Sequence, residues 1–162
     1  MNELPACLVV EADWVRDKAA IRGVRQRVFV EEQGIPVNLE WDGRDAVCRH
    51  VLALAGSTEV VATGRLQADG RIGRMAVLYE WRGRGVGSAL LDRLQHCALD
   101  SGLQRVYVHA RLDVAGFYSR AGFQAAGQPF TAADIPHIEM RKVLVHAGVI
   151  PAGVADPEIS RD

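Results

Sequence analysis

Three glycines alternate with other residues in the stretch EWRGRGVGSALL, at positions 83, 85 and 87 of a chain of 162 residues. The apolar residues that follow have helical spacing, so the glycines stand where a helix begins. A glycine-rich turn at a helix N-terminus exposes unpaired backbone N–H groups beside the positive end of the helix dipole. This arrangement suits a phosphate or pyrophosphate, and a tight turn with glycines for packing alone is the alternative. The stretch therefore predicts an anion-binding loop.

Two common phosphate-binding motifs do not fit this loop. A P-loop needs a lysine after its last glycine, and the residue after Gly87 is Ser88. The dinucleotide fingerprint GxGxxG also fails, because Ser88 occupies its third glycine position when the count starts at Gly83. The loop must therefore serve a different phosphate ligand.

The elements that would position this loop alternate between strand and helix patterns. Apolar, β-branched runs predict strands over residues 6–14, 50–56, 60–67, 71–78, 104–111 and 137–145. Helical spacing predicts helices over residues 21–29 and 86–101 and a short one within 113–123. We therefore expect one α+β domain over residues 4–146, with residues 147–162 as a loosely held tail.

Composition argues against several classes of partner. The chain has 19 basic and 20 acidic side chains, which gives no electrostatic reason to expect nucleic acid or an anionic membrane. No apolar stretch approaches the roughly 18 residues of a membrane span. An acidic residue also stands where a signal peptide has its basic region. We therefore expect a cytoplasmic protein, with a homodimer as an open possibility.

Cysteine and histidine give no sign of a metal site or a nucleophile. The three cysteines are too few and too scattered for a zinc site or a disulfide framework. Cys97 falls on the apolar face of the second helix, which is typical of a core residue. The five histidines lack metal-ligand spacing. The sequence predicts no metal.

Residues 82–87, RGRGVG, match the acyl-coenzyme A signature [QR]xxGx[GA] and resemble the GNAT N-acetyltransferase family. The surrounding run RMAVLYEWRGRGVGSALLDRL resembles the family's fourth strand, pyrophosphate loop and third helix. FYSRAGF resembles its fourth helix, and VFVEEQGIP, RHVLAL and PHIEM are most similar to the ElaA-like branch. The resemblance extends over roughly Leu4 to Val145.

The resemblance implies a mixed, mostly antiparallel sheet flanked by helices. Its fourth and fifth strands splay apart so that the pantetheine arm of acetyl-CoA, the implied co-substrate, lies between them. The cofactor residues implied by position are Met75, Ala76, Val77, Arg82, Gly83, Arg84, Gly85, Val86, Gly87, Ser88, Phe117 and Arg120.

One position departs from the family pattern. The family often has asparagine seven residues before the tyrosine of the fourth helix, and this chain has Arg111 there. Arginine has donors but no acceptor, so any hydrogen bond that the asparagine carbonyl would accept is lost. We expect Arg111 to contact a cofactor phosphate or the substrate instead.

Acetyl transfer to an amine needs a leaving-group acid and a base. Tyr118 suits the acid, because a phenol with a pKa near ~10 is protonated at neutral pH and can donate to the departing sulfur. The backbone N–H of Val77 is a candidate donor to the thioester oxygen. The base stays open among the Glu31–Glu32 pair, His109, His137 and a water relay, and Glu31 and His137 are also candidate acceptor-binding residues.

The sequence as a whole predicts an acetyl-CoA-dependent N-acyltransferase. An acetyl group would move to a primary amine of a small molecule, peptide or protein by direct attack in a ternary complex. A non-catalytic acyl-CoA sensor, or an acyltransferase with another donor or acceptor, is the alternative. The segments expected to select the acceptor, residues 31–45 and 129–137, carry no decisive signature. The acidic residues of the first segment are expected to form an exposed loop, and the alternative is that they favour a cationic acceptor.

Overall fold

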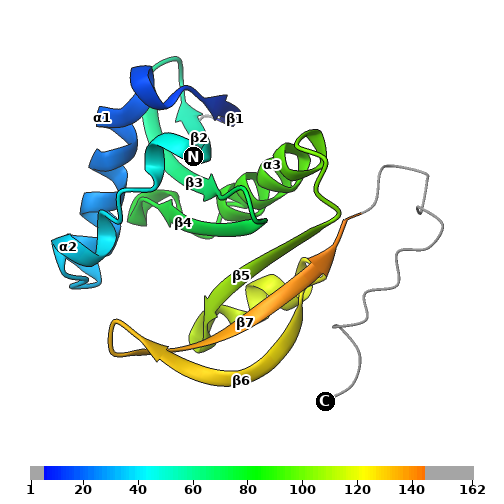
Figure 1. Ribbon diagram of the computed structural model, residues 1–162. Coiled ribbons are helices and arrows are strands. Elements are labelled where there is room, and N and C mark those ends of the chain that lie inside the picture. Colours follow the sequence, from blue (N-terminus) through cyan, green and yellow to red (C-terminus); the bar gives the residue numbers. More distant parts are fainter. Residues whose placement is uncertain (1–5, 145–162) are drawn as a thin grey trace.

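The computed structural model describes residues 6–144, which form a seven-stranded sheet with helices on its faces (Figure 1). The predicted domain limits, Leu4 and His146, and the predicted tail over residues 147–162 lie outside the described residues. The strand order is β1-β2-β3-β4-β5-β7-β6. Every neighbouring pair is antiparallel except β4 and β5, which are parallel. The predicted mixed, mostly antiparallel sheet is therefore confirmed.

The first half of the sheet is a meander, as the sequence predicts. Its strands are β1 (Cys7–Ala12), β2 (Arg49–Ala55), β3 (Glu59–Leu66) and β4 (Arg71–Val77). Short turns join β2 to β3 and β3 to β4, which is typical of antiparallel neighbours. The buried apolar residues of β2 and β3 form much of the core with those of helix α3 (Val86–Asp100).

The second half of the sheet holds one strand that the sequence analysis missed. Strands β5 (Arg105–Arg111) and β7 (Ile135–Val143) are predicted, but β6 (Gln124–Ala132) is not. Its sequence, QAAGQPFTA, has alanine, glycine and proline where strands prefer β-branched residues. Pairing with β7 nevertheless holds it in the sheet, with a register shift between Ala126 and Phe130 around its Gly-Gln-Pro segment. Helix α4 (Ala115–Arg120) precedes it.

The first helix begins earlier than predicted. Helix α1 (Trp14–Arg25) starts where the Asp13 carboxylate accepts the backbone N–H of Arg16 at 2.9 Å, a side-chain cap at its N-terminus. Its first turns are mostly exposed, so apolar spacing does not mark them. The helix continues as a π-helical segment (Gln26–Glu32), and the short α2 (Val37–Glu40) follows.

The predicted exposed acidic segment over residues 31–45 is partly wrong. Glu40 and Asp45 are 2% and 5% exposed, and both accept hydrogen bonds from the buried Arg25 at 2.7 Å. Arg65 of β3 donates to the same Asp45 at 3.1 Å and to Asp42 at 2.8 Å. These five residues, of which only Asp42 is exposed, form a buried charge network that ties α1 and α2 to the sheet. Desolvated charges are tolerated because each has an opposite partner.

We predict that Arg25→Met destabilises the fold strongly. Methionine fills much of the same volume but leaves Glu40 and Asp45 without their 2.7 Å donor. Removing one partner of a buried ion pair costs about 3–5 kcal/mol. The free energy of unfolding in urea measures this loss.

The matched control is Arg16→Met, which removes an arginine that is 71% exposed and paired with Asp17. Its effect should stay within about 0.5 kcal/mol. Similar losses in the two variants would mean that the buried charge network adds nothing beyond a surface ion pair.

Candidate active site

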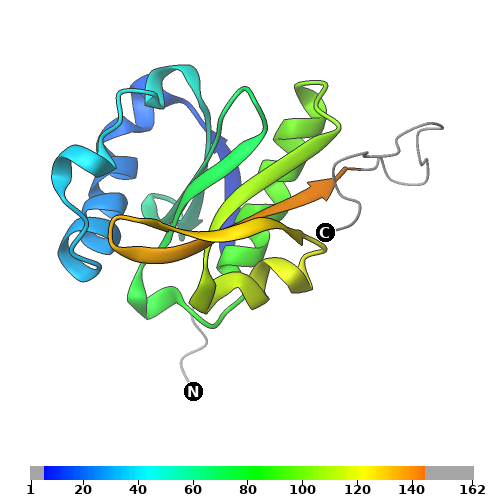
Figure 2. The ribbon, with the colours of Figure 1, turned by 60° about the horizontal axis from the view of Figure 1, so that its bottom comes forward.

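Strands β4 and β5 separate soon after they meet. Only two residue pairs are in register between them, Arg71 with Tyr107 and Ile72 with Val108. Both strands continue, to Val77 and Arg111, while the space between them widens (Figures 1 and 2). The facing backbone groups of these continuations are not paired by another strand of the described chain. They are therefore available to a ligand that brings its own donors and acceptors.

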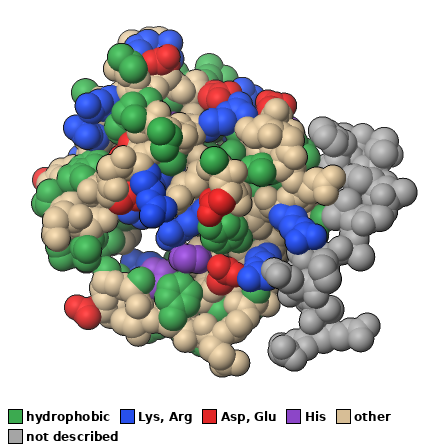
Figure 3. All heavy atoms as spheres, viewed as in Figure 1, with side chains coloured by type: hydrophobic (Ala, Val, Ile, Leu, Met, Phe, Trp, Pro, Cys, Tyr) green, Lys and Arg blue, Asp and Glu red, His purple; other side chains and the backbone are tan. Residues whose placement is uncertain are grey.

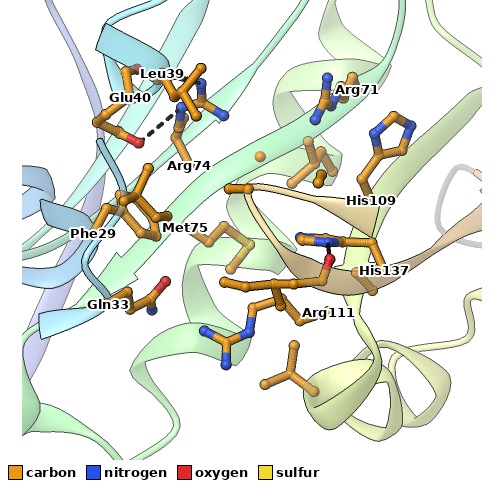
Figure 4. A pocket seen from close by; sticks show the side chains of 18 of the residues that line it. Phe29, Gln33, Leu39, Glu40, Arg71, Arg74, Met75, His109, Arg111 and His137 are labelled. Atoms are coloured by element: carbon orange, nitrogen blue, oxygen red, sulfur yellow. Dashed lines mark hydrogen bonds and ion pairs between the residues drawn. The ribbon is translucent and has the colours of Figure 1, made fainter. Parts of the chain in front are cut away.

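A cavity of about 450 Å³ occupies this opening (Figure 4). Its walls come from β4, β5, α4, the segment around α2 and the turn between β6 and β7. The polar side chains of its lining are Gln33, Glu40, Arg71, Arg74, His109, Arg111, Tyr118 and His137. Apolar groups such as Phe29 and Met75 fill the space between them. This combination of apolar walls and a few polar groups is typical of a small-molecule site.

The glycine-rich loop lies at the N-terminus of α3, as predicted. Gly83 and Gly85 have φ of +73° and +78°, which explains glycine at both positions. A Cβ added at either would meet no atom within 4 Å, so the loop borders open space. No side chain of the described residues caps α3, whose N-cap is Gly85. The first amides of α3 thus have the arrangement that binds pyrophosphate, and the loop fits the coenzyme A that the resemblance implies.

Gly87 has a different role from the two glycines before it. A Cβ at this position would contact the Phe117 ring of α4 at 3.6 Å, an ordinary packing distance. Phe117 in turn packs edge-to-face on Tyr118, with ring centroids 5.1 Å apart. The first turn of α3 and the tyrosine are therefore linked through one aromatic ring.

The hydroxyl of Tyr118 lies inside the protein, close to the opening between the strands. It is 3.8 Å from the Met75 sulfur of β4. Burial raises the pKa of Tyr118 to about 12. The phenol is therefore protonated at neutral pH and keeps a proton to donate.

His109 of β5 lines the cavity and is neutral at pH 7. Burial, together with the positive charge of Arg71, holds the pKa of His109 below its ordinary value, against the opposing effect of Glu139. Its Nε2 lies 3.3 Å from a Glu139 oxygen, and its ring packs edge-to-face on Phe130. A neutral imidazole in a cavity wall can accept a proton.

Two other predicted residues line the same cavity. His137 of β7 holds its Nδ1 2.7 Å from the Ile135 carbonyl oxygen and stacks on Phe130. Arg111, at the end of β5, is paired with Asp113 at 2.8 Å. His137, His109 and Arg111 therefore come together on one face of β5 and β7, as Figure 4 shows.

The predicted acidic residues of the first helix do not reach this cavity. Glu31 is exposed, and neither it nor Glu32 is among the lining residues. Glu32 forms an ion pair with Arg82 at 2.9 Å, while Arg82 donates from Nε to the Val77 carbonyl oxygen at 2.9 Å. Arg82 thus fastens the end of β4 to the π-helical segment, rather than turning its side chain into the glycine loop.

The remaining two predicted arginines are not among the residues that line the cavity. Arg84 packs over the Trp81 ring at 5.3 Å, and Arg120 is exposed at the end of α4. Their predicted role in cofactor binding stays a prediction.

Sequence reasoning missed Arg71 and Arg74, which belong to β4 and border the cavity (Figure 4). Arg74 has a φ of +49°, unusual for a residue with a side chain, at the register shift between β3 and β4. It lies 3.4 Å from Glu40 of the buried charge network. The run RIGRMAV reads as an ordinary strand, so nothing in it signals this bulge.

Neither a membrane-spanning helix nor a cluster of metal-binding side chains is found within residues 6–144. No helix within residues 6–144 is long and apolar enough to cross a membrane. The same residues contain no group of three or more His, Cys, Asp and Glu side chains placed to hold a metal ion.

Comparison with known proteins gives consistent matches. A sequence model of the acetyltransferase (GNAT) domain matches residues 44–144. The Escherichia coli protein ElaA is 31% identical over 136 residues, which are 79% of this chain and 88% of ElaA. Its crystal structure superposes with a TM-score of 0.73 at 30% identity, covering 83% of this chain and 99% of that one.

Two further proteins match this chain over most of their length. The Bacillus subtilis protein YjcF, named as an uncharacterized N-acetyltransferase, is 31% identical over 122 residues, 74% of this chain and 87% of YjcF. The crystal structure of an acyl-CoA N-acyltransferase from Pseudomonas aeruginosa has a TM-score of 0.76 at 30% identity. It covers 85% of this chain and all of that chain.

We predict that Gly87→Glu weakens coenzyme A binding. The side chain fits beside Phe117 but adds a negative charge at the helix N-terminus, where the pyrophosphate should bind. Each charge-assisted hydrogen bond contributes about 1.5–3 kcal/mol, so losing one should raise Kd by about tenfold or more. Calorimetry measures this Kd.

Gly23→Glu is the control, because Gly23 is an exposed glycine of helix α1 with no neighbour near its Cβ. Pantetheine, which lacks the pyrophosphate, should bind the Gly87 variant and the unmodified protein alike. An unchanged Kd for coenzyme A in a folded Gly87→Glu protein would refute the pyrophosphate assignment.

Proposed function

The chain belongs to the GNAT acetyltransferase family, in its ElaA-like branch, and from this premise we propose that it is an acetyl-CoA-dependent N-acetyltransferase. The observation that carries the proposal is the opening between β4 and β5, with the glycine loop at one end and Tyr118 beside it. The proposed acceptor is a primary amine, which attacks directly in a ternary complex.

In this proposal, backbone groups hold the acyl donor. Acetyl-CoA supplies the acetyl group as a thioester. The amides from Arg84 to Ser88 bind its pyrophosphate, and the open edge at Met75, Ala76 and Val77 binds the pantetheine arm. Because the N–H of Leu78 bonds the Val61 carbonyl oxygen at 2.9 Å, the preceding N–H of Val77 points away from β3, towards β5. That N–H is a suitable donor to the thioester oxygen.

His109 is the base that the geometry favours. It lines the cavity and is neutral at pH 7, whereas the carboxylate of Glu32 is engaged by Arg82 outside the lining. The imidazole therefore takes the proton that the attacking amine loses. Tyr118, with a buried and protonated hydroxyl, donates a proton to the sulfur that leaves. His137 and Arg111 border the space for the acceptor.

We predict that Tyr118→Phe lowers kcat while leaving the Kd for acetyl-CoA nearly unchanged. The substitution removes one hydroxyl and keeps the ring that packs on Phe117 and Phe123. A proton donated to the leaving sulfur helps mainly in the transition state. General acid catalysis contributes about 10²–10⁴-fold, and we expect the low end because a thiolate leaves readily.

Steady-state rates of thiol release, beside calorimetry of acetyl-CoA, separate the two effects. A full rate in Tyr118→Phe would remove Tyr118 as the acid. A protein that binds acetyl-CoA but releases no thiol with any amine of a broad panel would instead be a sensor.

We predict that kcat at saturating substrates falls at acid pH through protonation of His109. The pKa of His109 is lowered, so the imidazole should remain neutral even somewhat below pH ~6.5. The value of kcat should therefore remain at its plateau in that range. Protonation at still lower pH removes the base. Tyr118, with a pKa of about 12, should cause no loss at moderately alkaline pH.

His109→Gln keeps a polar side chain but cannot accept the proton, so it should lower kcat about 10²-fold or more and abolish the acid limb. A pH profile in His109→Gln that keeps the same acid limb would assign the base to another group.

A further inference from the structure

The cavity is bordered by more basic than acidic side chains. Its lining includes Arg71, Arg74 and Arg111, and Glu40 is the single carboxylate among the lining side chains of residues 6–144. Figure 3 shows basic and histidine side chains around a hollow, where Figure 1 shows β4 and β5 apart. Asp113 balances Arg111. Arg74 forms ion pairs with Glu40 and Asp42, so the surplus charge lies with Arg71.

Arg74 keeps spare hydrogen-bonding capacity. Its Nη2 reaches the Leu39 carbonyl oxygen at 3.3 Å and the Asp42 carboxylate at 3.4 Å, and its Nε lies 3.4 Å from Glu40. These contacts are long beside the 2.7 Å bonds of Arg25. The Nε is also buried without a hydrogen-bond partner in the described chain. A buried donor without a good hydrogen bond is costly, and the ion pair with Glu40 at 3.4 Å offsets only part of that cost.

The guanidinium of Arg71 has fewer contacts than that of Arg74. Within residues 6–144 its guanidinium makes no hydrogen bond and no ion pair. The acidic side chains on neighbouring elements have other partners. Asp69 accepts from the Tyr107 hydroxyl and from the backbone N–H of Arg71, and Glu139 lies against His109 and Arg141. Neither acid lines the cavity.

Gly73 leaves a gap between these two arginines. Side chains alternate along a strand, so Arg71 and Gly73 share a face, which is also that of the paired Arg65. The register shift turns Arg74 to this face as well, because Arg74 and Arg65 both contact Asp42. A Cβ at Gly73 would meet nothing within 4 Å, and its φ is not positive. Neither backbone geometry nor packing requires glycine here, so the gap is room for a ligand.

We propose that the acceptor is an amine that also carries a carboxylate, and that this carboxylate binds over Gly73 between the guanidinium groups of Arg71 and Arg74. The proposal rests on the proposed acetyltransferase function. Arginine is the side chain best suited to a carboxylate, because its planar fork of donors matches the two oxygens. Figure 4 shows both arginines towards one end of the pocket and Met75, whose sulfur Tyr118 contacts, nearer its centre. The amine end of such an acceptor can therefore extend towards the reacting centre. An amino acid has this chemistry.

Matched acceptors test the charge requirement. Glycine, β-alanine, γ-aminobutyrate and L-lysine would each be compared with the corresponding carboxamide or decarboxylated amine in a thiol-release assay. The acids should have the lower KM.

For the best acid, Arg71→Gln should raise KM about tenfold to a hundredfold, the range expected for a lost charge-assisted hydrogen bond. Its carboxamide should be affected little. Arg71→Lys should restore part of the loss, and Arg93→Gln, an exposed arginine of α3, should change neither KM.

Binding gives a second readout that does not depend on turnover. The N-acetylated form of the same acid, titrated into protein loaded with coenzyme A, should bind with a Kd raised to a similar degree by Arg71→Gln. Acceptors without a carboxylate that are acetylated equally well, with no effect of Arg71→Gln, would overturn this inference and leave the acetyltransferase function standing. Carboxylate binding that depends on Arg71, without thiol release from any amine, would support the anion site and count against the proposed function.

Discussion

Strands β4 and β5 are held together at two residue pairs and then diverge, although a sheet normally satisfies its backbone groups by continued pairing. The separation makes the cavity, and neighbouring elements hold it open from both sides. Arg82 bonds the Val77 carbonyl oxygen and anchors the end of β4 to Glu32. On the other side, β5 pairs with β7 along its whole length. Each strand is therefore held by a different partner, and these contacts keep the two strands apart.

The buried charge network fixes the position of the α2 segment, which forms one wall of the cavity. Arg25 joins Glu40 and Asp45, so the segment that carries α2 is fixed against α1 and β3 instead of being an exposed loop. Glu40 also faces Arg74, which lines the cavity. Burial raises the pKa of Glu40, and the hydrogen bond from Arg25 opposes this shift. Glu40 thus contacts both Arg25 of the network and Arg74 of the cavity wall. A substitution in the network should therefore also change the position of Arg74 in the cavity.

Much of the architecture follows from local sequence, and the exceptions have physical causes. The meander and the helix after the glycines follow from apolar periodicity and from residues 82–87, whereas the mixed sheet with separated fourth and fifth strands is implied by the family resemblance. Strand β6 has no such signal, because β7 and not its own composition keeps it extended. In the site, Tyr118, His109 and His137 are recognisable from motifs and strand phase. Arg71 and Arg74 are not, because their importance depends on a bulge and on partners far away in the chain.

Amide hydrogen exchange with and without acetyl-CoA tests most directly whether the opening between β4 and β5 binds the acyl donor. Our account predicts slower exchange at two separate places, the β4 segment Met75–Val77 and the amides from Arg84 to Ser88 in the glycine loop and first turn of α3. The amides of β1, at the far side of the sheet, should not change. Exchange rates that are the same in both segments with and without saturating acetyl-CoA would contradict this assignment of the donor site.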